Sequence, residues 1–198
     1  MNEPMAAAVL DSGIPVLGKI PWGSHFCNFY DGQGDLAECV IPFIKAGLAN
    51  NEVCFWVTSE PLNAKDARRL LVEVQPDLAE REASRQIMII DFADWYFDSQ
   101  RSVTARALED GLERLAGAKR RGYAGVRMSG NSFWLERKYW SLFSEYEAKL
   151  QDAVRNSRIA VLCSYSLQRC SARDTLEVIR HHDFAIFHDP AGWRVTRQ

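Results

Sequence analysis

The sequence has neither an excess of one charge nor a long hydrophobic run. It carries 24 Lys and Arg residues against 26 Asp and Glu residues, a formal net charge of −2 over 198 residues. A basic surface for nucleic acid is therefore not favoured. No apolar run approaches the roughly 18 residues that a membrane-spanning helix needs. We expect a protein that binds neither nucleic acid directly nor a membrane.

Closely spaced cysteine pairs and a basic leader are also missing. The first ten residues contain Glu3, no basic residue and an apolar stretch of only six residues, unlike a secretory signal. The cysteines are an odd number at wide spacing, which is typical of reduced thiols: Cys27, Cys39, Cys54, Cys163 and Cys170. These features predict a cytoplasmic protein.

Strand-length apolar runs alternate with helical patterns along most of the chain. The predicted strands cover residues 25–30, 53–57, 87–90, 125–128 and 159–165, and the predicted helices cover residues 35–47, 63–74, 102–120, 138–156 and 172–181. Strands that are apolar throughout are typical of a parallel sheet covered on both faces. The sequence predicts a three-layer α/β/α fold with a mainly parallel central sheet and a C-terminal β-hairpin at residues 184–187 and 193–195.

The domain organisation follows from composition. Residues 1–23 hold three of the seven prolines and three of the twelve glycines, which predicts an irregular N-terminal lead-in. Residues 24–198 contain no internal repeat, linker or low-complexity segment. We predict a single domain over this range.

Two glycine-containing stretches match phosphate-binding loops only in part. Residues 13–19 fit G-x-x-x-x-G-K, but Ile20 follows where a Ser or Thr would bind Mg²⁺. The turn at residues 31–34 has two glycines but no lysine, and Asp31 and Asp35 would repel a phosphate. The sequence disfavours ATP hydrolysis and leaves residual nucleotide binding as an alternative function.

Candidate ligand contacts lie at the strand ends and on the faces of the predicted strands, because open parallel sheets bind ligands outside the carboxyl ends of their strands. Aromatic side chains supply apolar area to such a pocket, and polar side chains orient the ligand. The predicted ligand-binding residues are His25, Cys27, Tyr30, Asp31, Arg127, Asn131, Trp134 and Tyr165.

His25 and Cys27 are two residues apart, which places both side chains on one face of a strand. Imidazole and thiolate also bind zinc or iron, and Cys163 lies on another predicted strand. No second pair with metal-ligand spacing accompanies them, so the sequence predicts neither a metal site nor a cofactor. A pocket for a small apolar ligand and plain core packing are the two leading interpretations.

Arg127 falls within an apolar strand pattern, where an arginine needs a partner. One interpretation is an anion clamp at the strand end, and the other is a buried structural ion pair. The candidate partners are Asp91, Glu145 and Glu147.

Several motifs, in order along the chain, resemble the MEDS family, the methanogen/methylotroph DcmR sensory domain. The resemblance extends over roughly residues 18–190 and is carried by residues 25–30, 40–48, 52–57, 95–96, 125–134, 145–147 and 162–165. It implies a RecA/KaiC-like domain whose phosphate-binding residues have degenerated. It also implies a sensor of small molecules, with hydrocarbon derivatives as proposed ligands.

The resulting functional prediction is a non-enzymatic small-molecule sensing or signal-relay domain. Since 198 residues leave no room for a further DNA-binding or kinase domain, its output is expected to pass through a partner regulator or kinase. A ligand-free protein–protein interaction module is a second alternative. Homo-oligomer formation is left open.

Overall fold

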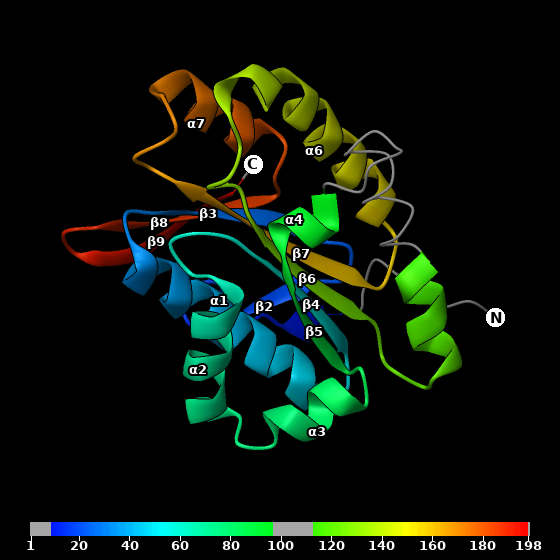
Figure 1. Cartoon of the computed structure of the whole chain (residues 1–198). Coiled ribbons are helices and arrows are strands. Elements are labelled where there is room, and N and C mark those ends of the chain that lie inside the picture. The colour runs from blue at the N-terminus through cyan, green and yellow to red at the C-terminus, as the bar shows by residue number, and fades with distance from the viewer. Residues whose placement is uncertain (1–8, 97–112, 198) are drawn as a thin grey trace.

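The computed structural model describes residues 9–96 and 113–197 (Figure 1). Its centre is a seven-stranded sheet with the order β5-β4-β6-β7-β3-β8-β9. The strands are β3 (His25–Tyr30), β4 (Val53–Thr58), β5 (Ile87–Asp91), β6 (Val126–Asn131), β7 (Ile159–Ser166), β8 (Phe184–Asp189) and β9 (Gly192–Arg197). Only β8 and β9 pair antiparallel in this sheet; all its other pairs are parallel. The predicted sheet and C-terminal hairpin are confirmed.

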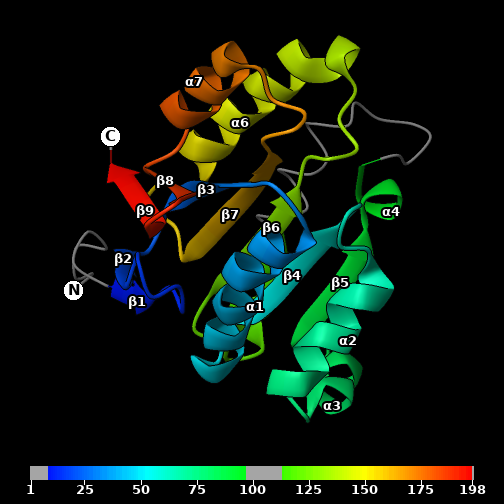
Figure 2. The same ribbon diagram turned by 90° about the vertical axis from the view of Figure 1, so that its left-hand side faces the viewer.

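Helices cover both faces of the sheet (Figures 1 and 2). One face carries α1 (Gln33–Ala49), α2 (Ala64–Val74) and α3 (Leu78–Ala83), and the other carries α6 (Trp140–Val154) and α7 (Ala172–Arg180). Two short helices follow strands, α4 (Phe92–Tyr96) after β5 and the 3₁₀-helix η2 (Arg137–Tyr139) after β6. The predicted three-layer arrangement is confirmed.

The strands are buried on both sides because each layer of helices has its own hydrophobic cluster. In β3, Phe26 and Tyr30 belong to the cluster beneath α1, whereas Cys27 and Phe29 belong to the cluster beneath α6. This alternation follows from the two-residue period of a strand. Whether a residue stands at an odd or an even position along its strand therefore decides on which face of the sheet its side chain lies.

The described part of the N-terminal lead-in is not irregular. Strands β1 (Val9–Asp11) and β2 (Lys19–Pro21) pair antiparallel, and Leu10 and Ile20 are buried in the cluster beneath α1. The intervening loop packs closely on that helix, since a Cβ on Gly13 would lie 2.1 Å from the Pro42 carbonyl oxygen. The prediction of an irregular segment is wrong here because turn-rich hairpins and irregular segments share the same proline and glycine content.

Helix boundaries differ from the predictions at several places. Helix α1 begins at Gln33, two residues before the predicted start, with Gly32 as its N-cap, so Asp35 lies in its first turn. The short helices α3 and α4 had no counterpart in the predictions. Residues 102–112 of the predicted helix at 102–120 lie outside the described residues, and residues 113–120 are helical.

Candidate functional site

A small cavity lies on the α6 face of the sheet. Its volume is about 30 Å³, enough for about two water molecules. Helices α4 and α6 and strand β7 contribute much of its wall, including Trp95, Tyr96, Phe143, Tyr146, Cys163 and Tyr165. The cavity is therefore mostly apolar and much smaller than a typical ligand pocket.

Tyr165 contributes a polar group to this wall. The residue is 1% exposed, and its hydroxyl makes no hydrogen bond of ordinary geometry among the described residues. Burial and the nearby Glu147 carboxylate raise the pKa of Tyr165 well above its ordinary value. The phenol therefore stays protonated and can donate a hydrogen bond.

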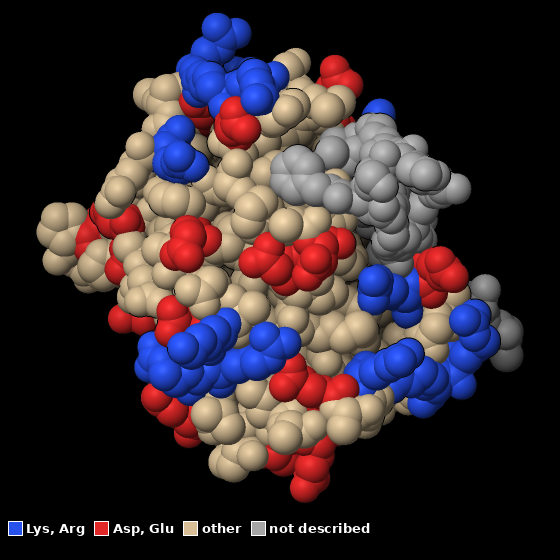
Figure 3. Space-filling view, in the orientation of Figure 1, with Lys and Arg blue, Asp and Glu red and all other residues tan. Residues whose placement is uncertain are grey.

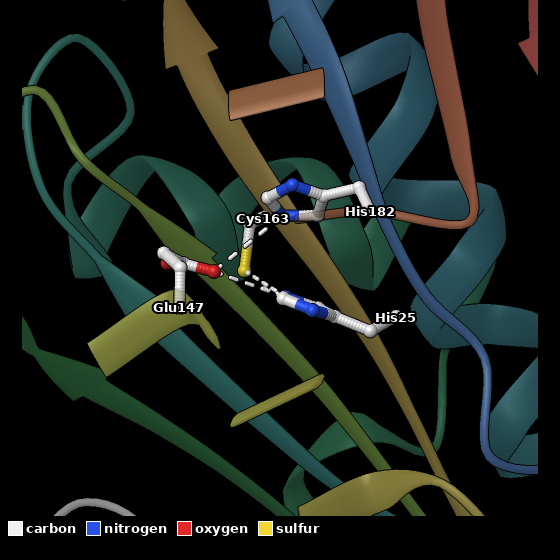
Figure 4. A group of neighbouring side chains, drawn as sticks. All are labelled: His25, Glu147, Cys163 and His182. Carbon is white, nitrogen blue, oxygen red and sulfur yellow. Dashed lines mark hydrogen bonds and ion pairs between the residues drawn. The ribbon is translucent and has the colours of Figure 1, made fainter. Parts of the chain in front are cut away.

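Four buried side chains from separate parts of the chain converge beside the cavity (Figure 4). They are His25 of β3, Glu147 of α6, Cys163 of β7 and His182, which follows α7. One ligand atom from each lies within 4.8 Å of all the others. Glu147 and Cys163 also line the cavity. We call this group the four-residue centre.

The contacts within the centre are short. The Nε2 atom of His25 lies 3.0 Å from Glu147 Oε2 and 3.3 Å from Cys163 Sγ. The Nε2 atom of His182 lies 3.4 Å from the same Glu147 oxygen. The two imidazole rings tilt against each other with centroids 4.1 Å apart.

Hydrogen bonds outside the centre orient both imidazoles. Gln151 donates from Nε2 to Asp183 Oδ1 at 2.8 Å, which leaves its Oε1 to accept from His25 Nδ1 at 3.0 Å. His182 Nδ1 lies 2.6 Å from the Val178 carbonyl oxygen, which can only accept. Because both Nδ1 atoms donate, each neutral ring has its lone pair on Nε2, facing the centre.

Burial and charge set the protonation of the centre. Burial opposes ionisation of Glu147, but the two imidazoles outweigh it and lower the pKa of this carboxyl group. Burial and the neighbouring His25 lower the pKa of His182. Burial, followed by the Glu147 carboxylate, raises the pKa of the Cys163 thiol well above its ordinary value. An ionised Glu147 carboxylate thus lies beside a Cys163 thiol that keeps its proton and a His182 ring that ionises less readily than usual.

Four of the predicted ligand-binding residues lie on this face of the sheet. His25 joins the four-residue centre, and Tyr165 lines the cavity. Cys27 shares the face of His25 but is fully buried in the hydrophobic cluster. Trp134 packs beside the cavity, with its ring centroid 4.6 Å from that of Tyr96.

Tyr30 and Asn131 meet at the carboxyl ends of β3 and β6. The Tyr30 hydroxyl donates to Asn131 Oδ1 at 2.6 Å, and the Asn131 amide donates to the carbonyl of Glu60 at 2.9 Å. Asp31 is exposed, and its carbonyl accepts from Gln168 at 2.9 Å. Of these three residues, only Asn131 also lines the cavity.

Arg127 lies outside the candidate site, on the α1 side of the sheet. Its guanidinium binds both carboxylate oxygens of Glu52 at 2.7 and 2.9 Å. It also donates to the carbonyl oxygens of Asp11, Ser12 and Phe43. The interpretation as a buried ion pair is confirmed, and the predicted partners are wrong because Glu52 reaches Arg127 only through the pairing of β4 with β6.

Three members of the centre, Glu147, Cys163 and His182, were not among the predicted ligand-binding residues, and Cys163 was considered only as a metal ligand beside His25 and Cys27. Glu147 interrupts an apolar helical stripe formed by Phe143, Leu150 and Val154, and a carboxylate at such a position is a signal for a buried partner. His182 directly follows a predicted helix, where a histidine is already explained by the favourable interaction of a cation with the helix dipole. Its burial could not be inferred from the helix pattern.

The strand-to-helix connection that holds phosphate in nucleotide-binding folds is very short in this chain. Only Asp31 and Gly32 join β3 to α1. Asp31 donates its N–H to the Asp35 carboxylate at 3.1 Å, so two acidic side chains stand at this helix N-terminus. Lys19 belongs to β2, which pairs only with β1.

Comparison with known proteins assigns the family. The family model described as "MEDS: MEthanogen/methylotroph, DcmR Sensory domain" matches residues 24–183. The chain belongs to the MEDS family. The transcriptional repressor DcmR of Methylorubrum extorquens (strain DSM 6343 / CIP 106787 / DM4) is 23% identical over 167 residues, which are 83% of this chain and 60% of that protein. This MEDS chain thus spans well under two thirds of the length of that relative.

Two solved structures share the fold of this MEDS domain. The KaiC-like protein PH0186 from Pyrococcus horikoshii OT3 matches with a TM-score of 0.58 and 19% identity, over 91% of this chain and 80% of that chain. The flagellar accessory protein FlaH from Methanocaldococcus jannaschii matches with a TM-score of 0.59 and 12% identity, over 92% and 80%. The predicted RecA/KaiC-like fold is confirmed.

Proposed function

We propose that this MEDS domain is a non-enzymatic sensor that binds a very small molecule in the cavity beside Tyr165. Membership of a sensory-domain family and similarity to a transcriptional repressor support a regulatory sensory role. The observation that carries the ligand proposal is the buried Tyr165 hydroxyl at an apolar cavity, which makes no hydrogen bond of ordinary geometry among the described residues. A volume of about 30 Å³ suits a molecule of about two or three non-hydrogen atoms.

The side chains that line the cavity would transmit ligand binding to two helices. Trp95 and Tyr96 come from α4, and Phe143 and Glu147 come from α6, so a bound molecule contacts two helices at once. Occupancy shifts the domain between two conformations only if the molecule binds one of them more tightly. The shifted helices would then alter a surface that a partner regulator or kinase recognises.

The partner is proposed to be a protein. Basic and acidic side chains are interspersed over the face viewed in Figure 3. No helix among the described residues is both long and apolar enough to span a bilayer. We propose that transcriptional output, the role printed for DcmR, is reached here through that protein partner.

Ligand binding is tested by calorimetry and thermal unfolding with methanol and ethanol, which combine a small apolar part with a hydrogen-bonding oxygen. At 100 times its dissociation constant, a ligand should stabilise the domain by about 2.7 kcal/mol. Tyr165→Phe should weaken binding by removing the donor, and Val161→Ile should weaken it by filling the cavity. Tyr30→Phe removes a hydroxyl that does not line the cavity and is the matched control.

Equal stabilisation of wild-type protein, Tyr165→Phe and Val161→Ile would contradict binding at the cavity. An unchanged unfolding temperature across the panel would favour the ligand-free interaction module. The KaiC-like fold favours residual nucleotide binding as the other candidate, and calorimetry with Mg-ATP tests it. Micromolar ATP binding that is abolished by disrupting the turn at Gly32 would support that candidate.

A further inference from the structure

We propose that the four-residue centre, His25, Glu147, Cys163 and His182, binds a divalent transition-metal ion, with Zn²⁺ as the best fit. The sequence predicted no metal site because no second pair with metal-ligand spacing accompanies His25 and Cys27. The structure adds a carboxylate from α6 and a second imidazole after α7. Two imidazoles, one thiolate and one carboxylate are all ligand types that bind zinc.

The spacing of the ligand atoms fits a tetrahedral site. Zn²⁺ lies about 2.0–2.3 Å from nitrogen, oxygen and sulfur ligands, so neighbouring ligand atoms in a tetrahedron are about 3.3–3.7 Å apart. The His25 and His182 Nε2 atoms lie 3.0 and 3.4 Å from Glu147 Oε2, and His25 Nε2 lies 3.3 Å from Cys163 Sγ. All four ligand atoms lie within 4.8 Å of one another. The pairs that are up to 4.8 Å apart would have to close by up to about 1 Å to complete the geometry.

The hydrogen bonding of the centre leaves a place for a cation. Both imidazoles donate outward from Nδ1, so two Nε2 lone pairs and the Glu147 carboxylate face one another. Both Glu147 oxygens and His182 Nε2 make no hydrogen bond of ordinary geometry among the described residues, although both imidazoles and the Tyr165 hydroxyl lie close to the carboxylate. The Cys163 thiol has a single proton to offer to these acceptors. Even with the Tyr165 hydroxyl beside Glu147, the buried acceptors outnumber the donors, which favours a positive charge between them.

A divalent ion would balance the charges of the centre. The Glu147 carboxylate and a Cys163 thiolate together neutralise a 2+ ion, which is the condition for burying it at low cost. A thiolate and two imidazoles select zinc and similar transition metals over Mg²⁺ and Ca²⁺, which prefer oxygen ligands. The bonds from His25 to Gln151 and from His182 to the Val178 carbonyl are the outer contacts that metal-bound histidines usually make.

Four protein ligands describe a closed, structural site without an open coordination position. The ion would join β3, β7, α6 and the end of α7, which are distant in sequence. Because Glu147 and Cys163 also line the cavity, the ion would fix part of its wall. The metal proposal does not depend on the cavity binding a ligand.

The test is titration of the reduced, chelator-treated full chain with Co²⁺ followed by Zn²⁺. We expect one equivalent of Co²⁺ to bind, with a thiolate-to-cobalt charge-transfer band and the visible bands of a tetrahedral site, and Zn²⁺ to displace it. Cys163→Ser should remove the charge-transfer band, and His182→Gln should weaken binding by at least about tenfold. Cys39→Ser and His181→Gln are the matched controls and should bind as the wild type does.

Failure of the wild-type chain to show the charge-transfer band would overturn the proposal, as would equal affinity in His182→Gln and His181→Gln. A second measurement needs no variant. One equivalent of Zn²⁺ should raise the unfolding temperature of the chelator-treated wild-type protein, whereas Mg²⁺ should not. The absence of a zinc-specific rise would also overturn the proposal.

Discussion

Among the described residues, Arg127 is the only arginine or lysine that is buried. Its side chain and that of Glu52 are both 0% exposed, and the guanidinium also binds three backbone carbonyl groups. Removing one partner of such a pair leaves a buried charge without compensation. The residue therefore acts as a fixed link between β6, the turn before β4 and the loop after β1.

We expect Arg127→Met to destabilise the protein by about 3–5 kcal/mol, because Glu52 and the carbonyl groups would lose their partner. Urea denaturation followed by circular dichroism measures this loss. Arg68→Met is the matched control: the Arg68–Glu82 pair is 42% and 30% exposed, so its loss should cost about 0–1 kcal/mol. Similar losses in both variants would contradict the structural role of Arg127.

From the sequence, a site residue could be placed only where its position along a strand decides on which face of the sheet its side chain lies. The alternation of β3 correctly put His25 and Cys27 on one face. The partners of His25 could not be predicted, because Glu147 and His182 reach it from segments whose placement depends on helix packing. The pairing of Arg127 with Glu52 likewise depends on strand order, which local patterns do not contain.

Helix α7 illustrates how a short element is held in place. Ser171 and Asp174 form a capping box at its N-terminus, and the Arg137 guanidinium of η2 binds the same carboxylate. Asp174 is buried, which opposes its ionisation, but its bonds with Ser171 and Arg137 lower its pKa below the ordinary value. The helix that precedes His182 is therefore anchored by an ionised carboxylate.

We expect Ser171→Ala to destabilise the protein by about 1 kcal/mol at neutral pH through the lost cap, measured by denaturant unfolding.

The lowered pKa of Asp174 also predicts a pH dependence of stability. Its contribution is present above the unfolded pKa near 3.9 and is lost as the pH falls through the lower folded value. Denaturant unfolding at a series of acidic pH values should show a weaker pH dependence in Asp174→Asn than in wild type. Identical pH profiles would contradict this assignment.

At the scale of elements, long buried strands were easier to predict than short helices. The strand at residues 25–30 has the predicted bounds, whereas β6 extends beyond residue 128 because Ser129 and Asn131 are also buried. A polar residue in a buried strand interrupts the apolar pattern without ending the strand. Helices α3 and α4 are too short to show a helical period.

For the whole molecule, the N-terminal hairpin is a structural part of the domain. Leu10, Ile14 and Ile20 are buried beneath α1, and backbone carbonyl groups of Asp11 and Ser12 accept from Arg127. A domain that started at residue 24 would expose this cluster and leave the guanidinium without two acceptors. The predicted boundary thus divides a continuous core.

We expect a chain of residues 24–198 to be destabilised by several kcal/mol relative to the full chain, or not to fold. Ile20→Ala in the full chain removes one buried side chain of the hairpin without shortening the chain, so it tests the packing contribution alone. It should lower the free energy of unfolding by about 2–5 kcal/mol, since Ile20 is 1% exposed. The denaturant midpoints of the shortened chain and of Ile20→Ala, compared with that of the full wild-type chain, measure both losses of stability. A fragment as stable as the full chain would show that the hairpin is dispensable.

Strand β3 lies between β7 and β8, although it precedes both by more than half of the chain. The Ser164 hydroxyl donates to Asn28 Oδ1 from a position 136 residues later. During synthesis from the N-terminus, β3 therefore emerges from the ribosome long before either neighbouring strand exists. Both edges of β3 lack their strand partners until residues 159–189 have been made, so we expect productive folding to begin late and to benefit from a chaperone.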